Sequence, residues 1–287
     1  MPVILGTSLA WIIGGAPFHV LRFILALLAM VILHSAANML SDAFDYRRGL
    51  DRDITPVSGA VVRGWLTERQ ATAGAVALFV VGSAIGLVLV LSAGKTLFYV
   101  GAVGVAIGAC YTLLKYRALG DLAVFLNFGL LGSLGAWIVQ TGYFSWLPVI
   151  WTVPQAMLVA AILHANNWRD MVSDKERRVT TVASLLGDKG SLAYYGLLLF
   201  GSSLFIFGLI VLPRLFRWPM TPMPLTVFLI ILGWPIAFRL WGRARRRHAP
   251  RHPMDFVVLD GATSQYNLVF GTLCVLALWL DYVLTRL

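Results

Sequence analysis

Long apolar runs separated by short polar connections dominate this chain of 287 residues. Hydrophobic residues make up 59% of the sequence and charged residues only 13%, whereas a soluble domain averages about 25% charged residues. A helix that spans a bilayer needs about 20 mostly apolar residues. We therefore predict an all-α, polytopic membrane protein with about nine transmembrane helices in one bundle, forming a single domain over residues 1–287. The predicted helices cover 2–14, 17–45, 70–92, 96–114, 119–141, 147–168, 190–212, 222–241 and 263–284.

Basic residues predict the orientation of this bundle. The connections that follow the second, fourth, sixth and eighth predicted helices must lie on one face. Together with Arg239, at the end of the eighth helix, they carry 18 of the 23 Lys and Arg residues. Because cytoplasmic loops are enriched in Lys and Arg, we expect the N-terminus and these four connections in the cytoplasm, with the protein in the inner cell membrane. The same bias explains the net charge of +10, so we expect membrane lipid and no nucleic acid as a partner.

Asn and Asp residues gather in two short stretches, each at the end of a long apolar run. Acidic side chains at a bilayer are costly and mark functional sites by default. In the first stretch Asn38, Asp42 and Asp45 have the spacing i, i+4, i+7 and therefore share one helix face, and Asp51 follows them.

The second acidic stretch has the same character. Asn167 precedes Asp170 and Asp174, which are again four residues apart. Like charges at this spacing repel each other, and a shared cation removes the repulsion. Oxygen ligands favour Mg²⁺, which binds carboxylates together with substrate phosphates. We predict that both stretches share a Mg²⁺ site on the cytoplasmic face; the alternative is that they are ordinary solvated helix ends.

Basic residues near the same face are candidates for holding phosphate oxygens. Lys115 and Arg117 end the fourth predicted helix, and both residue types form charge-assisted hydrogen bonds with phosphate. The alternative is that they only mark the membrane interface. His34 and His164 each precede an Asn/Asp stretch, and we expect buried, hydrogen-bonded histidines there rather than acid/base groups. Further phosphate-binding candidates are Arg63, Arg169 and Lys175.

Four stretches of the chain resemble the UbiA-type intramembrane prenyltransferases. The resemblance is strongest to the branch that prenylates 1,4-dihydroxy-2-naphthoate in menaquinone synthesis, together with its animal relative that makes menaquinone-4. It is carried by NMLSDAFDYRRGLD (38–51), the weaker RGWLTERQ (63–70), YTLLKYRALGDLAVFLNFGLLGSLGAWIVQTG (111–142) and HANNWRDMVSDKERRVTTVASLLG (164–187).

This resemblance implies roles for individual residues. Tyr111 and Lys115 match the Tyr-x-x-x-Lys element of the family, with Lys115 expected at the diphosphate, and Asp121 stands in the Gly-Asp-Leu that follows. Ser41 departs from the pattern, because the first motif commonly begins Asn-Asp. The residues expected to bind Mg²⁺ and diphosphate are Asn38, Asp42, Asp45 and Asp51 in the first motif and Asn167, Asp170 and Asp174 in the second.

The implied function is Mg²⁺-dependent transfer of a prenyl group from an allylic prenyl diphosphate to an aromatic acceptor, here 1,4-dihydroxy-2-naphthoate, with release of pyrophosphate and CO₂. We expect Asp45, Lys115, Asp170 and Asp174 to be catalytic. One alternative is the same fold acting on 4-hydroxybenzoate, homogentisate, a chlorophyllide or a lipid alcohol. A second alternative, from another class, is a membrane transporter of an anionic substrate. The substrate-binding residues are expected to be Asn38, Arg63, Tyr111, Arg117, Asp121, Asn167, Arg169 and Lys175.

Overall fold

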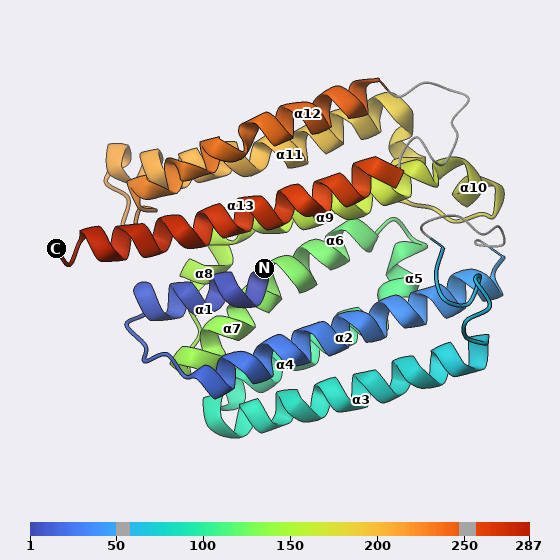
Figure 1. The fold of residues 1–287 in the computed structure, drawn as a ribbon, viewed down its shortest axis with the longest axis horizontal. Coiled ribbons are helices and arrows are strands. Elements are labelled where there is room, and N and C mark those ends of the chain that lie inside the picture. Colours follow the sequence, from blue (N-terminus) through green and yellow to red (C-terminus); the bar gives the residue numbers. More distant parts are fainter. Residues whose placement is uncertain (50–57, 247–256) are drawn as a thin grey trace.

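Helix overlies every apolar range predicted from the sequence, and the fold class is all-α as predicted (Figure 1). The computed structural model describes residues 1–49, 58–246 and 257–287. Several predicted helices are interrupted rather than continuous. The elements are α1 (Pro2–Ile12), α2 (Val20–Arg47), α3 (Glu68–Ala93), α4 (Lys95–Ala109), α5 (Tyr111–Lys115), α6 (Gly120–Val124), η1 (Phe125–Leu131), α7 (Gly132–Thr141), α8 (Trp146–Trp151), α9 (Val153–Arg169), α10 (Met171–Glu176), α11 (Val182–Phe216), η2 (Leu225–Gly233), α12 (Trp234–Arg245) and α13 (Val257–Leu284).

Six helical segments in the described ranges are long and apolar enough to cross a membrane. This finding supports an integral membrane protein, as predicted. Two further apolar helices, α1 and α4, are shorter than a full span, so the number of nine crossings and the direction of insertion stay predictions. The six segments are Val20–Arg47, Glu68–Ala93, Gly120–Thr141, Val182–Phe216, Leu225–Arg245 and Val258–Leu284.

Local sequence signals explain how α3 begins and ends. The Thr67 side chain accepts a hydrogen bond from the Gln70 backbone N–H, and the Gln70 side chain accepts one from the Thr67 backbone. This reciprocal capping box satisfies donors that the first turn leaves unpaired. At the other end Gly94 adopts a φ of 89°, a left-handed conformation that glycine tolerates best, and the chain turns directly into α4.

Helix α9 lies deep in the bundle. It packs against α11, α13 and η1, while α2 pairs with α3 along the outside. Large side chains fill the space around α9, including Trp168 on α9 itself, Tyr195 on α11 and Phe270 on α13, each at most 1% exposed. The second Asn/Asp motif lies at the end of α9, so the core of the protein holds it in place.

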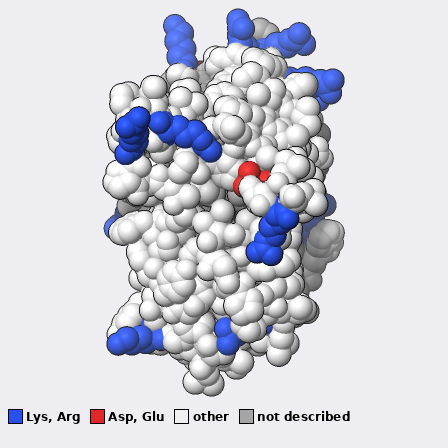
Figure 2. Space-filling view, turned by 90° about the vertical axis from the view of Figure 1, so that its left-hand side faces the viewer, with Lys and Arg blue, Asp and Glu red and all other residues white. Residues whose placement is uncertain are grey.

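The two ends of the bundle differ in character. The C-terminal ends of α2 and α9 lie at the same end of the molecule as α5 and α10 (Figure 1). Figure 2 looks at the opposite end, which shows mostly uncharged surface with basic side chains around its rim and little acidic surface. The fold therefore brings both Asn/Asp motifs, far apart in sequence, to one end.

Candidate active site

Asp45 is the centre of a buried polar cluster at the end of α2. Its carboxylate is only 7% exposed and accepts a hydrogen bond from the Lys115 ammonium, with Nζ 3.0 Å from Oδ2. The Tyr116 hydroxyl donates to Oδ1 at 2.7 Å, and the Ser41 hydroxyl donates to Oδ2 at 3.3 Å. Ser41 therefore takes part in the first motif by holding Asp45.

Lys115 connects the two acidic motifs electrostatically. Burial by itself lowers the pKa of the Lys115 ammonium, but the nearby Asp45 carboxylate raises it strongly and Asp174 of the second motif raises it further. The net result is a pKa well above the ordinary value for lysine, so Lys115 stays protonated at physiological pH. Asp174 is itself 6% exposed. A carboxylate from each motif thus stabilises the protonated form of Lys115.

Backbone hydrogen bonds fasten the segment after Lys115 to the segment after the second motif. The Ala118 N–H donates to the Thr180 carbonyl at 2.7 Å, and the Thr180 N–H donates to the Tyr116 carbonyl at 3.3 Å. On the outer side the Arg48 guanidinium lies 4.3 Å from the centre of the Tyr116 ring. These contacts hold the segment that follows Lys115 against the end of α2 and against Thr180, which follows α10.

Asp121 is the centre of a second buried cluster. Its carboxylate is 3% exposed and lies 3.2 Å from His164 Nδ1. The Asn167 side-chain amide donates to the other carboxylate oxygen at 3.2 Å. His164 is buried and hydrogen-bonded, as predicted. His34 is instead exposed, and its ring centroid lies 4.5 Å from that of Phe128 on η1.

Asp170 is held by the residue beside it. Arg169 Nε and Nη2 donate to the two oxygens of Asp170, both at 2.8 Å, and Arg169 Nη1 donates to Asp260 at 2.5 Å. The Arg169 guanidinium thus pairs with two carboxylates, and its contact with substrate stays a prediction. Asp260 begins the last helix, more than 80 residues away in sequence, and sequence reasoning missed it.

Other predicted site residues lie at the margin of these clusters. Asp42 accepts a hydrogen bond from the Val61 N–H at 3.1 Å. Arg63 donates through Nε to the Ser58 carbonyl at 2.9 Å, and its guanidinium lies 5.2 Å from the centre of the Trp65 ring. Tyr111 begins the short helix that ends at Lys115. Asn38, Arg117 and Lys175 are exposed, and Asp51 lies outside the described residues.

The donor chemistry of these residues fits Mg²⁺. All of the predicted ligands are carboxylates or amides, which suit a hard cation, and the negative charges of Asp45 and Asp174 both raise the pKa of Lys115. Within residues 1–49, 58–246 and 257–287, however, no three acidic, His or Cys side chains gather as a preformed metal site. Asp45 pairs with Lys115 and Asp170 pairs with Arg169, and these basic side chains compensate the charge of the two carboxylates.

A large apolar cavity lies between α2, α3, α4, η1 and α7, with a volume of about 500 Å³. On α2 its lining extends to Leu33, one residue before His34 and five before Asn38. On η1 it includes Phe128, which contacts His34. The cavity thus begins just below the first Asn/Asp motif and continues toward the other end of the bundle.

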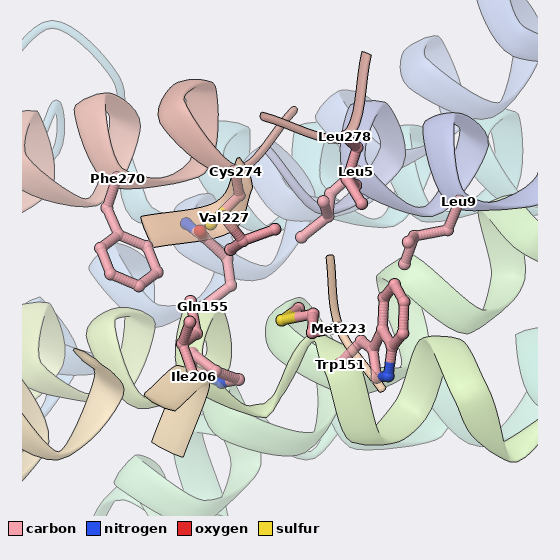
Figure 3. Close-up of a pocket in the computed structure, with 11 residues that line it drawn as sticks. Leu5, Leu9, Trp151, Gln155, Ile206, Met223, Val227, Phe270, Cys274 and Leu278 are labelled. Atoms are coloured by element: carbon pink, nitrogen blue, oxygen red, sulfur yellow. The ribbon is translucent and has the colours of Figure 1, made fainter. Parts of the chain in front are cut away.

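A small cavity lies on the opposite side of the bundle. It lies among α1, α9, η2 and α13, and side chains such as Trp151, Gln155 and Phe270 nearly fill it (Figure 3). Its free volume is about 10 Å³, roughly the minimum for a single water molecule. This space is too small for an organic substrate.

The chain matches the family model "UbiA prenyltransferase family" over residues 1–259. It is 32% identical to UbiA prenyltransferase domain-containing protein 1 of Mus musculus over 280 residues, which cover 94% of this chain and 76% of that protein. It is 26% identical to 1,4-dihydroxy-2-naphthoate octaprenyltransferase of Bacillus subtilis over 287 residues, which cover 98% of this chain and 88% of that protein.

Solved structures show the same fold. A UbiA homolog from Aeropyrum pernix K1 superposes with a TM-score of 0.70 at 17% identity, covering 98% of this chain and 96% of the other. A UbiA homolog from Archaeoglobus fulgidus, bound to DMAPP and Mg²⁺, superposes with a TM-score of 0.62 at 14% identity and covers 96% and 94% of the two chains. The resemblance found in the sequence is confirmed, and the enzyme class is favoured over a transporter. The chain belongs to the UbiA prenyltransferase family and is a prenyltransferase.

Proposed function

We propose that this enzyme transfers a prenyl group from an allylic prenyl diphosphate to an aromatic acceptor in a Mg²⁺-dependent reaction. The observation that carries the proposal is the ion pair of Lys115 with Asp45 of the first motif, 3.0 Å long, in a position where the charge of Asp174 of the second motif also raises the pKa of Lys115. The large apolar cavity begins beside this polar end. Such a site suits a ligand with a polyanionic head and a hydrocarbon tail.

Each residue of the site has a role in binding the diphosphate, the metal ion or the acceptor. Lys115 holds the diphosphate and stabilises the negative charge that develops as pyrophosphate leaves. Asp45, Asp170 and Asp174 are the central Mg²⁺ ligands and catalytic carboxylates. When bound, Mg²⁺ neutralises diphosphate charge and polarises the leaving oxygens. Further Mg²⁺ ligands are Asn38, Asp42, Asp51 and Asn167, and further substrate-binding residues are Arg63, Tyr111, Arg117, Asp121 and Lys175.

Arg169 has a positioning role in this proposal besides its predicted contact with substrate. It contacts Asp170 and Asp260 at once, so it orients Asp170 relative to the last helix. In this proposal the main contacts with the diphosphate come from Lys115 and from the exposed basic residues near it.

The reaction begins when the bond between the prenyl carbon and the diphosphate oxygen breaks. The electron pair of that bond leaves with pyrophosphate, and an allylic cation remains. A π electron pair of the aromatic ring forms the new carbon–carbon bond. With 1,4-dihydroxy-2-naphthoate the attacked carbon then releases its carboxylate as CO₂, whose bonding pair restores the aromatic ring.

The apolar cavity suits the prenyl tail and the cation. Burial of a hydrocarbon tail contributes about 0.8 kcal/mol per CH₂. Polar lining is sparse, with Ser83 and Asn127 among residues that are otherwise mostly Ala, Gly, Val, Leu and Phe. An apolar wall also keeps water away from the reactive cation.

We propose 1,4-dihydroxy-2-naphthoate as the acceptor and menaquinone synthesis as the setting. Support comes from the relative in Bacillus subtilis, which is named for that acceptor. The structure from Archaeoglobus fulgidus contains DMAPP and Mg²⁺, which supports the donor class and the metal. The other acceptor classes, 4-hydroxybenzoate, homogentisate and lipid alcohols, form the comparison panel of the test.

The test incubates detergent-purified protein with prenyl diphosphates of several lengths and each acceptor, with and without EDTA. We expect a prenylated product, identified by mass, and equimolar pyrophosphate when Mg²⁺ is present. With EDTA, product formation should fall below detection and return when excess Mg²⁺ is added. Product formation that is unchanged in EDTA would overturn the metal assignment, and a preference for another acceptor would overturn the naphthoate assignment.

We further propose a single membrane domain over residues 1–287 with nine crossings, placed in the inner membrane with its N-terminus and site in the cytoplasm. Cysteine labelling tests this topology after Cys110 and Cys274 are replaced by alanine. Trp65→Cys and Glu176→Cys should react only with reagent supplied from the cytoplasm, because both positions are exposed at the site end. Trp146→Cys, exposed at the opposite end, should react only from outside. Labelling of positions 65 and 176 from opposite sides of the membrane would refute the proposed topology.

A further inference from the structure

Asn127 places an unpaired carboxamide in the wall of the apolar cavity. It belongs to η1, a π-helical segment between α6 and α7, and it lines the cavity together with Phe79 and Phe128. Within the described parts of the chain, its side chain makes no hydrogen bond. π-helical segments of this kind are rare and are frequently found at functional sites.

Two glycines on α4 make room for this carboxamide. A Cβ added at Gly104 would lie 3.1 Å from Asn127 Oδ1, and a Cβ added at Gly108 would lie 3.6 Å from Asn127 Nδ2. The amide therefore lies against the α4 backbone, where a larger residue would crowd it. Gly108 also lies near the Phe79 ring, so an aromatic surface adjoins the polar group.

An unpaired amide is costly in an apolar setting, because neither lipid nor a hydrocarbon tail can form hydrogen bonds with it. A prenyl tail alone would leave this cost uncompensated. The amide can both donate and accept a hydrogen bond. Its natural complement is a hydroxyl or carbonyl oxygen on a flat, largely apolar ligand.

The depth of Asn127 matches the place where the aromatic ring must react. Asn127 follows Asp121 by six residues, which corresponds to about 9 Å along a helix. Lys115 and Asp45 hold the diphosphate above this level in the proposed reaction. The attacking ring must approach the first prenyl carbon from beneath the diphosphate, and this brings it beside Asn127, Phe79 and Phe128.

We propose that the Asn127 carboxamide hydrogen-bonds an oxygen substituent of the aromatic acceptor and thereby determines which acceptor is used. The inference rests on the proposed prenyl transfer, and it identifies the part of the site that recognises the aromatic ring of the acceptor. Phe79 and Phe128 supply apolar contact for the ring faces.

Asn127→Leu tests this role, since leucine has nearly the same size and cannot form hydrogen bonds. We expect KM for 1,4-dihydroxy-2-naphthoate to rise about tenfold, the effect of losing one buried hydrogen bond, while KM for the prenyl diphosphate stays unchanged. Asn127→Ser, which keeps a hydrogen-bonding group, should recover part of the loss. Ser92→Ala is the matched control, because the Ser92 hydroxyl bonds only its own helix, at the Leu89 carbonyl.

Acceptor analogues separate a direct contact from a general packing effect. The wild-type enzyme is compared on 1,4-dihydroxy-2-naphthoate, 1-hydroxy-2-naphthoate and 4-hydroxy-2-naphthoate. We expect kcat/KM to fall at least tenfold for the analogue that lacks the hydroxyl read by Asn127, and this discrimination should shrink to less than threefold in Asn127→Leu. Since the comparison is made within each enzyme, partial misfolding of the variant does not alter it.

The outcomes distinguish the inference from the proposed function. If the wild-type enzyme prenylates none of the acceptors, the proposed function fails. If it prenylates them and Asn127→Leu shows the wild-type KM and the same discrimination among analogues, the reaction stands and the role of Asn127 is refuted. A rise in KM for the prenyl diphosphate alone would also refute it, because Asn127 would then contact the donor.

Discussion

Replacing Lys115 with methionine should lower prenyl transfer by about a thousandfold or more. Methionine keeps the length and apolar stem of lysine but removes a cation whose pKa is raised by both Asp45 and Asp174. Removing one preorganised group that stabilises developing negative charge typically costs about 10²–10³ in kcat, and loss of diphosphate binding adds to that. The measurement is kcat and KM for the prenyl diphosphate with purified variant protein.

Two further variants control for folding in this experiment. Lys115→Met leaves the Asp45 carboxylate with only the Tyr116 and Ser41 hydroxyls, and breaking a buried ion pair costs about 3–5 kcal/mol. Lys115→Arg retains the positive charge and should keep more activity than the methionine variant. Lys95→Met, at the opposite end of the bundle, should behave as wild type. A well-folded Lys115→Met enzyme with normal kcat would remove Lys115 from the mechanism.

Asp45→Asn and Asp174→Asn should each lower activity by at least about a hundredfold, even though they belong to different motifs. The reason is that each change removes one negative charge from a site that both motifs build together. Asp170→Asn should have a comparable effect, because Arg169 holds both oxygens of that carboxylate in place. The matched control is Asp281→Asn, a partly buried carboxylate in the last turns of α13.

The double variant sharpens this prediction. Groups that act as one unit show strongly non-additive effects, so Asp45→Asn combined with Asp174→Asn should be little worse than either single variant. If instead the two losses multiply, the motifs act at separate sites and the convergence argument is wrong. Steady-state kcat/KM at saturating Mg²⁺ provides the comparison.

Hydrophobicity and spacing predict most of the architecture. The apolar ranges indicate where helix forms, because a chain in a bilayer must satisfy its backbone hydrogen bonds internally. The spacing of Asn38, Asp42 and Asp45 correctly predicts one face of α2, and the end of α9 carries the second motif as expected. The interruption at η1 is different, since a π-helical segment depends on packing against α4 and α9 rather than on a local sequence signal.

The pairing of the charged residues needed the structure. Sequence reasoning joined the carboxylates through a cation, whereas Asp45 pairs with Lys115 and Tyr116 from a segment 70 residues away. The Tyr116 hydroxyl was missed although it directly follows Lys115. Asp260 was missed because a single acid at the start of an apolar helix gives no sign of its partner, Arg169. Contacts of this range depend on how helices pack, which spacing along one helix does not encode.

The central claim is that the two Asn/Asp motifs bind one diphosphate through Mg²⁺ and Lys115. Its most direct test is calorimetric binding of geranyl S-thiolodiphosphate, an analogue whose sulfur bridge slows cleavage, to the wild type, Asp45→Asn and Asp174→Asn with and without Mg²⁺. We expect affinity to fall at least about a hundredfold, or ~2.7 kcal/mol, when Mg²⁺ is removed or either carboxylate is replaced. Equally tight binding without Mg²⁺ would contradict the account. Wild-type affinity in either Asp45→Asn or Asp174→Asn would contradict it as well.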